Sequence, residues 1–395
     1  MKGSIQKKGK TYYAVIALNG KRKWFKGGKK RDAERVLGEK LDEISRGTYR
    51  QIPKTTFKEF ADLWMKNHAE NNVKPSTLAG YNHIIDKRLN PEFEHFFMTD
   101  INPALLQSYI TKRKQDKDAR GKEKKKDEES EMRKNIISTK TISNEIVVIK
   151  KMFKHAHQWG YVKVNPAEHI QRPKIFKPEI EILEPGEFQK LLENSGSLYR
   201  VAFLTAILTG VRAGELWGLQ WDDLDWNSKQ IYVRRSVWKN GFQTPKLKNS
   251  IRKIDLPDNL LYELKKWKLA CPNSEYDLMF PSREGLITCH DNAIKRHFEP
   301  ALRKTGLRHV TFHSLRHTNA SLRIRAEQNI KYMSVQMGHS SIKITMDTYG
   351  HLFNDEVFNR QQVDLLQEFF HSVRNPLENT LQNAEKGLAV VANPL

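Results

Sequence analysis

The sequence predicts a multidomain α+β protein with three parts. These are a small β-sheet with one helix, an all-helical domain, and a mixed, mainly helical domain that holds a short antiparallel sheet. Hydrophobic residues recur at helical spacing along most of the 395-residue chain, whereas β-rich runs occur in two short regions. The length allows two or three domains, each with its own hydrophobic core.

The first segment, residues 1–50, combines a predicted hairpin with a basic helix. An apolar run from Tyr12 to Leu18 reaches Asn19-Gly20, which favours a tight hairpin turn, and Trp24-Phe25 follows in the partner strand. A helix is predicted from about Lys30 to Arg46. The segment holds 15 Lys and Arg against 5 Asp and Glu, in a chain of net charge +22. This excess predicts a module that binds nucleic acid, and a basic face that contacts only solvent is the alternative.

The second segment, residues 54–172, is predicted to be all helical. Thr55 or Thr56 can cap its first helix. A charged insertion at about 114–135 has almost no apolar residues and is expected to be flexible or an exposed helical extension. The segment 170–178, IQRPKIFKP, is the predicted linker because its prolines resist regular structure.

The third segment, residues 179–375, is predicted to mix helices with a short β region. Gln230 to Trp238 is rich in β-formers, and Ile251 to Leu256 is expected to return as a partner strand. An amphipathic stretch closes the domain, and residues 376–395 are predicted to be a flexible tail. The apolar positions of that stretch are Val357, Val363, Leu366 and Phe370.

Several function classes lack their sequence signals here. No apolar stretch approaches the roughly 20 residues that span a bilayer, and no signal peptide is apparent. There is no GxxxxGK loop, no HExxH and no Cys/His cluster with zinc spacing. The sequence therefore predicts no cofactor and no metal site. It also predicts that the protein is located in the cytoplasm, where the DNA is.

Four short patterns in the third segment place chemically useful residues together. They are TGVRAGEL (209–216) with Arg212, TPKLK (244–248), HSLRHT (313–318) with His313 and Arg316, and MGHSSI (337–342) followed by TYGH (348–351). Taken singly, each has a plain alternative. Arg212 can be a surface residue paired with Glu215, and the TPKLK hairpin can touch phosphates without catalysis.

Together the four patterns resemble the tyrosine recombinases, specifically the integrases of phages and conjugative elements. The resemblance implies the catalytic set Arg212, Lys246, His313, Arg316, His339 and Tyr349, in that order along the chain. Lys248 is the alternative to Lys246, because hairpin registers slip. Residues 1–50 then correspond to an arm-type DNA-binding domain, 54–172 to a SAM-like core-binding domain, and 179–375 to the catalytic domain.

The resemblance also implies roles for these residues. Two arginines bind the phosphate oxygens bidentately, which suits phosphoryl transfer without a metal. Tyr349 attacks the phosphate, His313 takes the tyrosine proton, Lys246 protonates the departing 5′ oxygen, and His339 supports the phosphate. A 3′-phosphotyrosyl intermediate preserves the energy of the broken bond, so ATP is not needed.

The implied partners are double-stranded DNA at arm and core attachment sites, a homotetramer assembled on DNA, and DNA-bending accessory proteins in a bacterial nucleoid. The alternatives are a dimer-resolving recombinase, a type IB topoisomerase, a metal-dependent transposase and a catalytically silent DNA-binding regulator. A dimer-resolving recombinase usually lacks an N-terminal module such as residues 1–50, and a transposase needs a carboxylate triad.

Overall fold

The computed structural model describes residues 3–18, 20–47, 49, 52–116, 137–175, 180–239, 241–243, 251–350 and 356–374. Within the last range it describes the side chains of 360 and 363–371. The chain divides into two compact units, Met1–Lys177 and Pro178–Leu395. Most of the predicted insertion, part of the predicted linker and the whole predicted tail lie outside the described residues.

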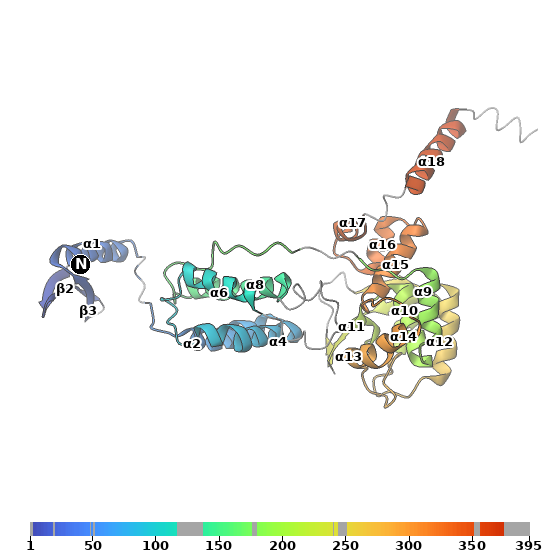
Figure 1. The fold of residues 1–395 in the computed structure, drawn as a ribbon, viewed down its shortest axis with the longest axis horizontal. Coiled ribbons are helices and arrows are strands. Elements are labelled where there is room, and N and C mark those ends of the chain that lie inside the picture. Colours follow the sequence, from blue (N-terminus) through green and yellow to red (C-terminus); the bar gives the residue numbers. More distant parts are fainter. Residues whose placement is uncertain are drawn as a thin grey trace, which may run out of the picture. The chain divides into compact units, whose positions relative to one another are not determined.

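A three-stranded antiparallel sheet opens the first unit. Its strands are β1 (Gly3–Lys8), β2 (Thr11–Leu18) and β3 (Lys21–Gly28), in the order β1-β2-β3, and α1 (Lys30–Ser45) follows (Figure 1). Ala14, Val15 and Ile16 of β2 are buried with Ala33 of α1. A Cβ on Gly27 would lie 2.3 Å from the Cα of Ala33, so this glycine allows β3 and α1 to approach closely.

The rest of the first unit is helical. Thr56 caps α2 (Phe57–Trp64), and its side chain and that of Glu59 form a reciprocal capping box. The other α-helices are α3 (Glu70–Asn72), α4 (Pro75–Ile84), α5 (Asn90–Phe93), α6 (Pro103–Gln115) and α8 (Thr139–Gln158). Single π-helical turns, η1 (Met65–Ala69) and η2 (Ile85–Leu89), join α2 to α3 and α4 to α5. Buried aromatic and aliphatic side chains of α2, α6 and α8 form one core.

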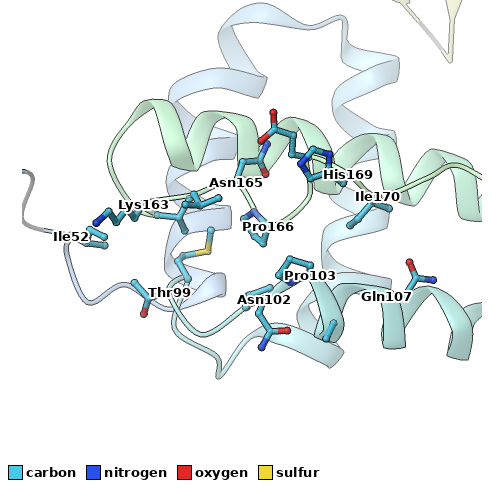
Figure 2. Close-up of a pocket in the computed structure, with 16 residues that line it drawn as sticks. Ile52, Thr99, Asn102, Pro103, Gln107, Lys163, Asn165, Pro166, His169 and Ile170 are labelled. Atoms are coloured by element: carbon cyan, nitrogen blue, oxygen red, sulfur yellow. The ribbon is translucent and has the colours of Figure 1, made fainter. Parts of the chain in front are cut away.

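A cavity of about 710 Å³ lies at one end of this helical part. Figure 2 shows its lining from two sides: Thr99 and Asn102 before α6 with Pro103, its first residue, and Pro166 and His169 from the segment after α8. None of the predicted catalytic residues that the structure describes lines this cavity.

The second unit contains two small antiparallel sheets. The first has the order β4-β5-β8, with β4 at Leu224–Asp225, β5 at Gln230–Val233 and β8 at Arg252–Asp255. The second pairs β6 (Ser236–Trp238) with β7 (Gly241–Gln243). The predicted run from Gln230 to Trp238 is therefore two strands, which belong to different sheets.

Helices surround the larger sheet of this unit. The α-helices are α9 (Pro185–Glu193), α10 (Ser197–Thr209), α11 (Ala213–Leu216), α12 (Asp258–Ala270), α13 (His290–Ala293), α14 (Glu299–Lys304), α15 (Ser314–Arg325), α16 (Ile330–Met337), α17 (Ile342–Tyr349) and α18 (Glu356–Arg374). A 3-10 turn, η4 (Trp221–Asp223), precedes β4, and a π-helical turn, η6 (Ile294–Phe298), joins α13 to α14. The central helix is α10, which contacts α9, α11, α12 and α15 (Figure 1). The first of the predicted catalytic motifs, TGVRAGEL, begins at its C-terminal end.

The last described helix, α18, exposes an apolar row. Val363, Leu366 and Phe370, which the sequence predicted on its apolar face, are each more than half exposed. In the part of the chain that the structure describes, no helix is long and apolar enough to cross a membrane.

Candidate active site

Arg212 stands in a turn between two helices. Gly210 ends α10 in the left-handed conformation, with φ of +66°, and Arg212 is the N-cap of α11. Its Nη1 donates to Oε1 of Glu215 over 2.9 Å, and its Nη2 donates to the Gly338 carbonyl over 3.2 Å. About 40% of the side chain is exposed, so the guanidinium is held in place and still open to a ligand.

Arg316 lies on α15 and is almost completely buried. Its Nη1 donates to the Gly210 carbonyl, and its Nη2 donates to the Met337 carbonyl over 2.6 Å. The carbonyl groups of 210 and 337–338 thus orient both predicted arginines. These backbone groups end α10 and α16, so three segments distant in sequence converge here.

Glu215 and Arg252 form a buried frame behind Arg212. Oε2 of Glu215 accepts from the Arg212 backbone N–H over 2.9 Å and from Nη2 of Arg252 over 3.0 Å. Nε of Arg252 donates to the Gln336 carbonyl over 2.8 Å. A Cβ on Gly338 would lie 2.9 Å from this guanidinium, so the frame also requires a glycine at the end of α16.

Electrostatics explains the charge state of Glu215. Burial raises the pKa of this carboxyl, but the charges of Arg252 and Arg212 and their hydrogen bonds outweigh burial, so its net pKa is lowered. Glu215 therefore stays ionised and positions two guanidinium groups. From the sequence, Glu215 was expected only as the plain partner of Arg212, and Arg252 only as part of the strand from Ile251 to Leu256.

His339 follows Gly338 in the turn after α16. Its Nδ1 lies 2.7 Å from Oγ1 of Thr345, which fixes the ring orientation. Burial, followed by the charges of Arg316, Arg212 and Arg252, lowers the pKa of His339 to about 3, so its imidazole is neutral at neutral pH. Its ring stacks on that of Tyr349, with the centroids 6.4 Å apart.

Tyr349 is the last residue of α17 and is 1% exposed. Burial raises the pKa of its hydroxyl to about 12, although Arg316 and Arg212 act in the opposite direction. Its Oη lies 2.8 Å from Nδ1 of His317. The sequence included His317 in the HSLRHT motif but gave it no role.

His313 lies one helical turn before His317, at the N-cap of α15. The two imidazole rings meet edge to face with centroids 4.7 Å apart. Burial, then the charges of Arg316 and Arg212, lower the pKa of His313. The structure therefore brings together five of the six predicted residues; the sixth, Lys246, and its alternative Lys248 lie outside the described residues.

This arrangement combines fixed positive charge with a phenol that remains protonated. Two guanidinium groups beside a hydroxyl can bind an anion such as a phosphodiester, because they carry planar pairs of donors. Within the described residues, no group of three or more His, Cys, Asp or Glu side chains is placed to hold a metal ion.

Family models match two parts of the chain. Residues 181–356 match the phage integrase family, and residues 56–113 match the phage integrase N-terminal SAM-like domain. Together these matches cover more than half of the sequence, and the larger one contains every predicted catalytic residue.

Curated relatives match over most of the chain. A protein described as tyrosine recombinase XerC-like, from Caldanaerobacter subterraneus, is 28% identical, over 93% of this chain and 99% of its own. The ICEBs1 integrase of Bacillus subtilis is 27% identical, over 76% of this chain and 79% of its own. The integrase of Staphylococcus phage L54a is 24% identical, over 81% and 94% respectively.

Solved structures share the fold. The Tn1549 transposon integrase in complex with a circular intermediate DNA matches with a TM-score of 0.62 and 18% identity, over 78% of this chain and 99% of that one. A lambda integrase tetramer bound to a Holliday junction matches with a TM-score of 0.57 and 18% identity, over 85% and 95%. With the two family models and the full-length relatives, these matches place the chain among the tyrosine recombinases of the phage integrase family.

Proposed function

We propose that the protein is a site-specific DNA recombinase that integrates or excises a mobile element, with Tyr349 as its covalent nucleophile. One observation carries the proposal. Arg212 and Arg316 are held by the same turn segments, and the charge of both acts on the Tyr349 hydroxyl, where it opposes the rise in pKa that burial causes.

The proposed clamp consists of Arg212 and Arg316. Each guanidinium presents N–H donors to the non-bridging oxygens of the scissile phosphate. Since both are held by backbone carbonyls and Glu215, little reorganisation accompanies the development of charge in the transition state. His339, neutral and oriented by Thr345, is proposed to donate a hydrogen bond to the same phosphate.

The proposed nucleophilic step follows from this clamp. Tyr349 loses its proton, and its phenolate oxygen attacks phosphorus. The bond from phosphorus to the 5′ oxygen then breaks, which gives a 3′-phosphotyrosyl bond and a free 5′-hydroxyl. The family resemblance implies that His313 removes the tyrosine proton and that Lys246 or Lys248 protonates the 5′ oxygen. The phosphotyrosyl bond preserves the energy of the cut strand, so no metal and no ATP are required.

The proposed partner is double-stranded DNA at core and arm attachment sites. Related integrases have been solved on DNA as a dimer at a core site and as a tetramer on a Holliday junction. A homotetramer on DNA is proposed here as well. In it, the exposed apolar row of α18, which includes Val363, Leu366 and Phe370, offers a surface for a neighbouring protomer.

We propose that residues 1–50 bind the arm sites. Residues 54–172 and the catalytic domain, residues 179–375, are proposed to bind the core sites. The basic first segment supports this division, because a duplex attracts clustered Lys and Arg side chains. DNA-bending accessory proteins at the bacterial nucleoid complete the proposed assembly.

A covalent-adduct assay tests this function. The intact protein is incubated in EDTA with a nicked suicide duplex that carries the junction of its own element, and products are separated on a denaturing gel. Wild type should give a slow-migrating adduct, whereas Tyr349→Phe should give none and still shift the duplex in a native gel. An adduct formed by Tyr349→Phe would refute the nucleophile. DNA binding without any adduct, at verified core sites, would favour a silent DNA-binding regulator.

A further inference from the structure

The hydroxyl of Tyr349 has a direct imidazole partner on α15. Its Oη lies 2.8 Å from Nδ1 of His317, within the 2.6–3.2 Å reach of a nucleophile and its base. Among the described residues, no hydrogen bond joins His313 to Tyr349. His313 contacts the His317 ring instead.

The protonation states of the two groups fit a donor and an acceptor. Burial raises the pKa of Tyr349 to about 12, so its oxygen carries a proton at neutral pH. Burial, then the charges of His313 and Arg316, lower the pKa of His317 to about 4, so its imidazole is neutral. A neutral imidazole with its hydrogen on Nε2 presents Nδ1 as an acceptor.

We infer that His317, in place of the His313 that the family resemblance implies, is the general base that removes the proton from Tyr349. The inference rests on the proposed function, because it needs Tyr349 as nucleophile. In the forward step the O–H proton of Tyr349 moves to Nδ1 of His317 while the phenolate oxygen bonds to phosphorus, and the departing 5′ oxygen takes a proton from the lysine of the proposed function. In religation the 5′-hydroxyl returns its proton to that lysine and attacks phosphorus, the phenolate leaves, and His317 returns the proton to Tyr349.

The surroundings of His317 indicate how DNA would activate this base. The groups around it are His313 and Arg316 on α15, Tyr349 on α17, and His339 beside the Tyr349 ring. A phosphodiester bound by Arg316 offsets a positive charge that lowers the pKa of His317. The pKa therefore rises when substrate binds, and the imidazole becomes a stronger base at that moment.

The alternative is that His317 only holds Tyr349 in a buried position. His317→Asn separates the two roles, because an amide can accept a hydrogen bond near the place of Nδ1 but cannot take up a proton near neutral pH. His317→Ala removes both capacities and leaves space for free imidazole. His313→Asn, one turn away on the same helix face, is the comparison variant, because the family resemblance gives the role of base to His313.

The test is the pH dependence of single-turnover cleavage of the nicked suicide duplex between about pH 6 and 9. We expect a nearly flat wild-type rate. His317→Asn should be slower by about 100-fold or more at pH 7, with a rate that rises about tenfold per pH unit as hydroxide replaces the base. Imidazole added to His317→Ala should restore cleavage. Native-gel DNA binding and the urea unfolding midpoint of each variant verify that it is folded.

Two results would overturn the inference. One is a folded His317→Asn that keeps a flat profile and a rate within about threefold of wild type. The other is a hydroxide-dependent profile for His313→Asn together with a flat profile for His317→Asn, which would make His313 the base. Either result leaves the proposed function intact as long as Tyr349→Phe forms no adduct. Adduct formation by Tyr349→Phe would instead refute the proposed function itself.

Discussion

Glu215 and Arg252 form an ion pair of 3.0 Å in which each side chain is less than 5% exposed. They lie 37 residues apart and join helix α11 to strand β8. Because the same carboxylate also binds the backbone and side chain of Arg212, the pair connects the folding of this unit with the position of a proposed catalytic arginine.

Glu215→Gln should destabilise the second unit by about 3–5 kcal/mol, because it leaves Arg252 buried beside a neutral amide. Urea denaturation, with hydrogen exchange of α10, α11 and β8, measures the effect. The matched control is Asp258→Asn, which breaks an exposed pair with Lys229 and should cost at most about 1 kcal/mol. Equal losses of unfolding free energy in both variants would show that the buried ion pair stabilises the unit no more than the exposed one.

The stabilisation by Glu215 should depend on pH. Its pKa is lower in the folded protein than the ordinary value of 4.5, because Arg252 and Arg212 outweigh burial. Such a group contributes fully above its unfolded pKa, and the contribution is lost as pH falls through the folded pKa. The stability gap between wild type and Glu215→Gln should therefore be constant from pH 8 to about 6 and narrow below about pH 4.5. A gap that widens in acid would contradict this assignment of charge.

Arg212→Lys should lower cleavage by about 100-fold or more while DNA binding persists. A lysine ammonium keeps the charge but cannot donate to Glu215, the Gly338 carbonyl and a phosphate with one planar fork. Adduct formation and native-gel affinity, measured together, separate the two effects. Arg325→Lys, the same change in an exposed pair with Glu184, is the control and should cleave at the wild-type rate. Near-normal cleavage by Arg212→Lys would remove it from the proposed clamp.

Local patterns were sufficient to predict much of the fold. The run from Tyr12 to Leu18 is β2, and Thr56 proved to be the cap of α2. By contrast, β1 has the sequence GSIQKK, which lacks apolar alternation, and it forms because β2 offers an unpaired edge. Helix α8 begins at Thr139, because the side chain of Ser138 caps it.

In the site, too, short sequence motifs predict some residues, whereas contacts between residues distant in sequence were not predictable. The motif wording led to the prediction of Arg212, Arg316 and Tyr349 as catalytic residues, because each stands in a short distinctive string. The contacts of Glu215 with Arg252 and of His317 with Tyr349 join residues 37 and 32 positions apart, and no local periodicity encodes them. The sequence offered one hint of the contact with Tyr349: His317 is a polar residue within the HSLRHT motif to which no role was assigned.

Deletion of residues 1–50 should abolish binding to arm sites and spare binding to core sites. The three-stranded sheet and α1 have their own small core, so removing them together leaves the helical core of the first unit intact. Footprinting on separate arm and core duplexes, at a stated salt concentration, measures this. An arm-site footprint that survives the deletion would show that other residues read those sites.

Glu145→Gln should loosen the helical part of the first unit. Glu145 is 1% exposed and accepts from Nε and Nη2 of Arg113, over 2.9 and 2.6 Å, and from the Tyr109 hydroxyl over 2.8 Å. Losing the carboxylate leaves Arg113 with only the partly exposed Asp116 as its acidic partner among the described residues. The expected cost is about 3–5 kcal/mol, compared with about 0.5–1.5 kcal/mol for Tyr109→Phe, which removes one hydrogen bond.

Hydrogen exchange of α6 and α8 in the intact chain measures this loosening directly, because both helices contribute side chains to the buried cluster. Glu92→Gln is the control, since Glu92 pairs with Lys112 of α6 at the surface and should leave exchange unchanged. If α6 and α8 exchange in Glu145→Gln at the wild-type rate, the ion pair with Asp116 is sufficient to balance the charge of Arg113. Faster exchange in these two helices, with unchanged exchange in α10 and α15, would show that the buried cluster stabilises the packing of α6 against α8 locally.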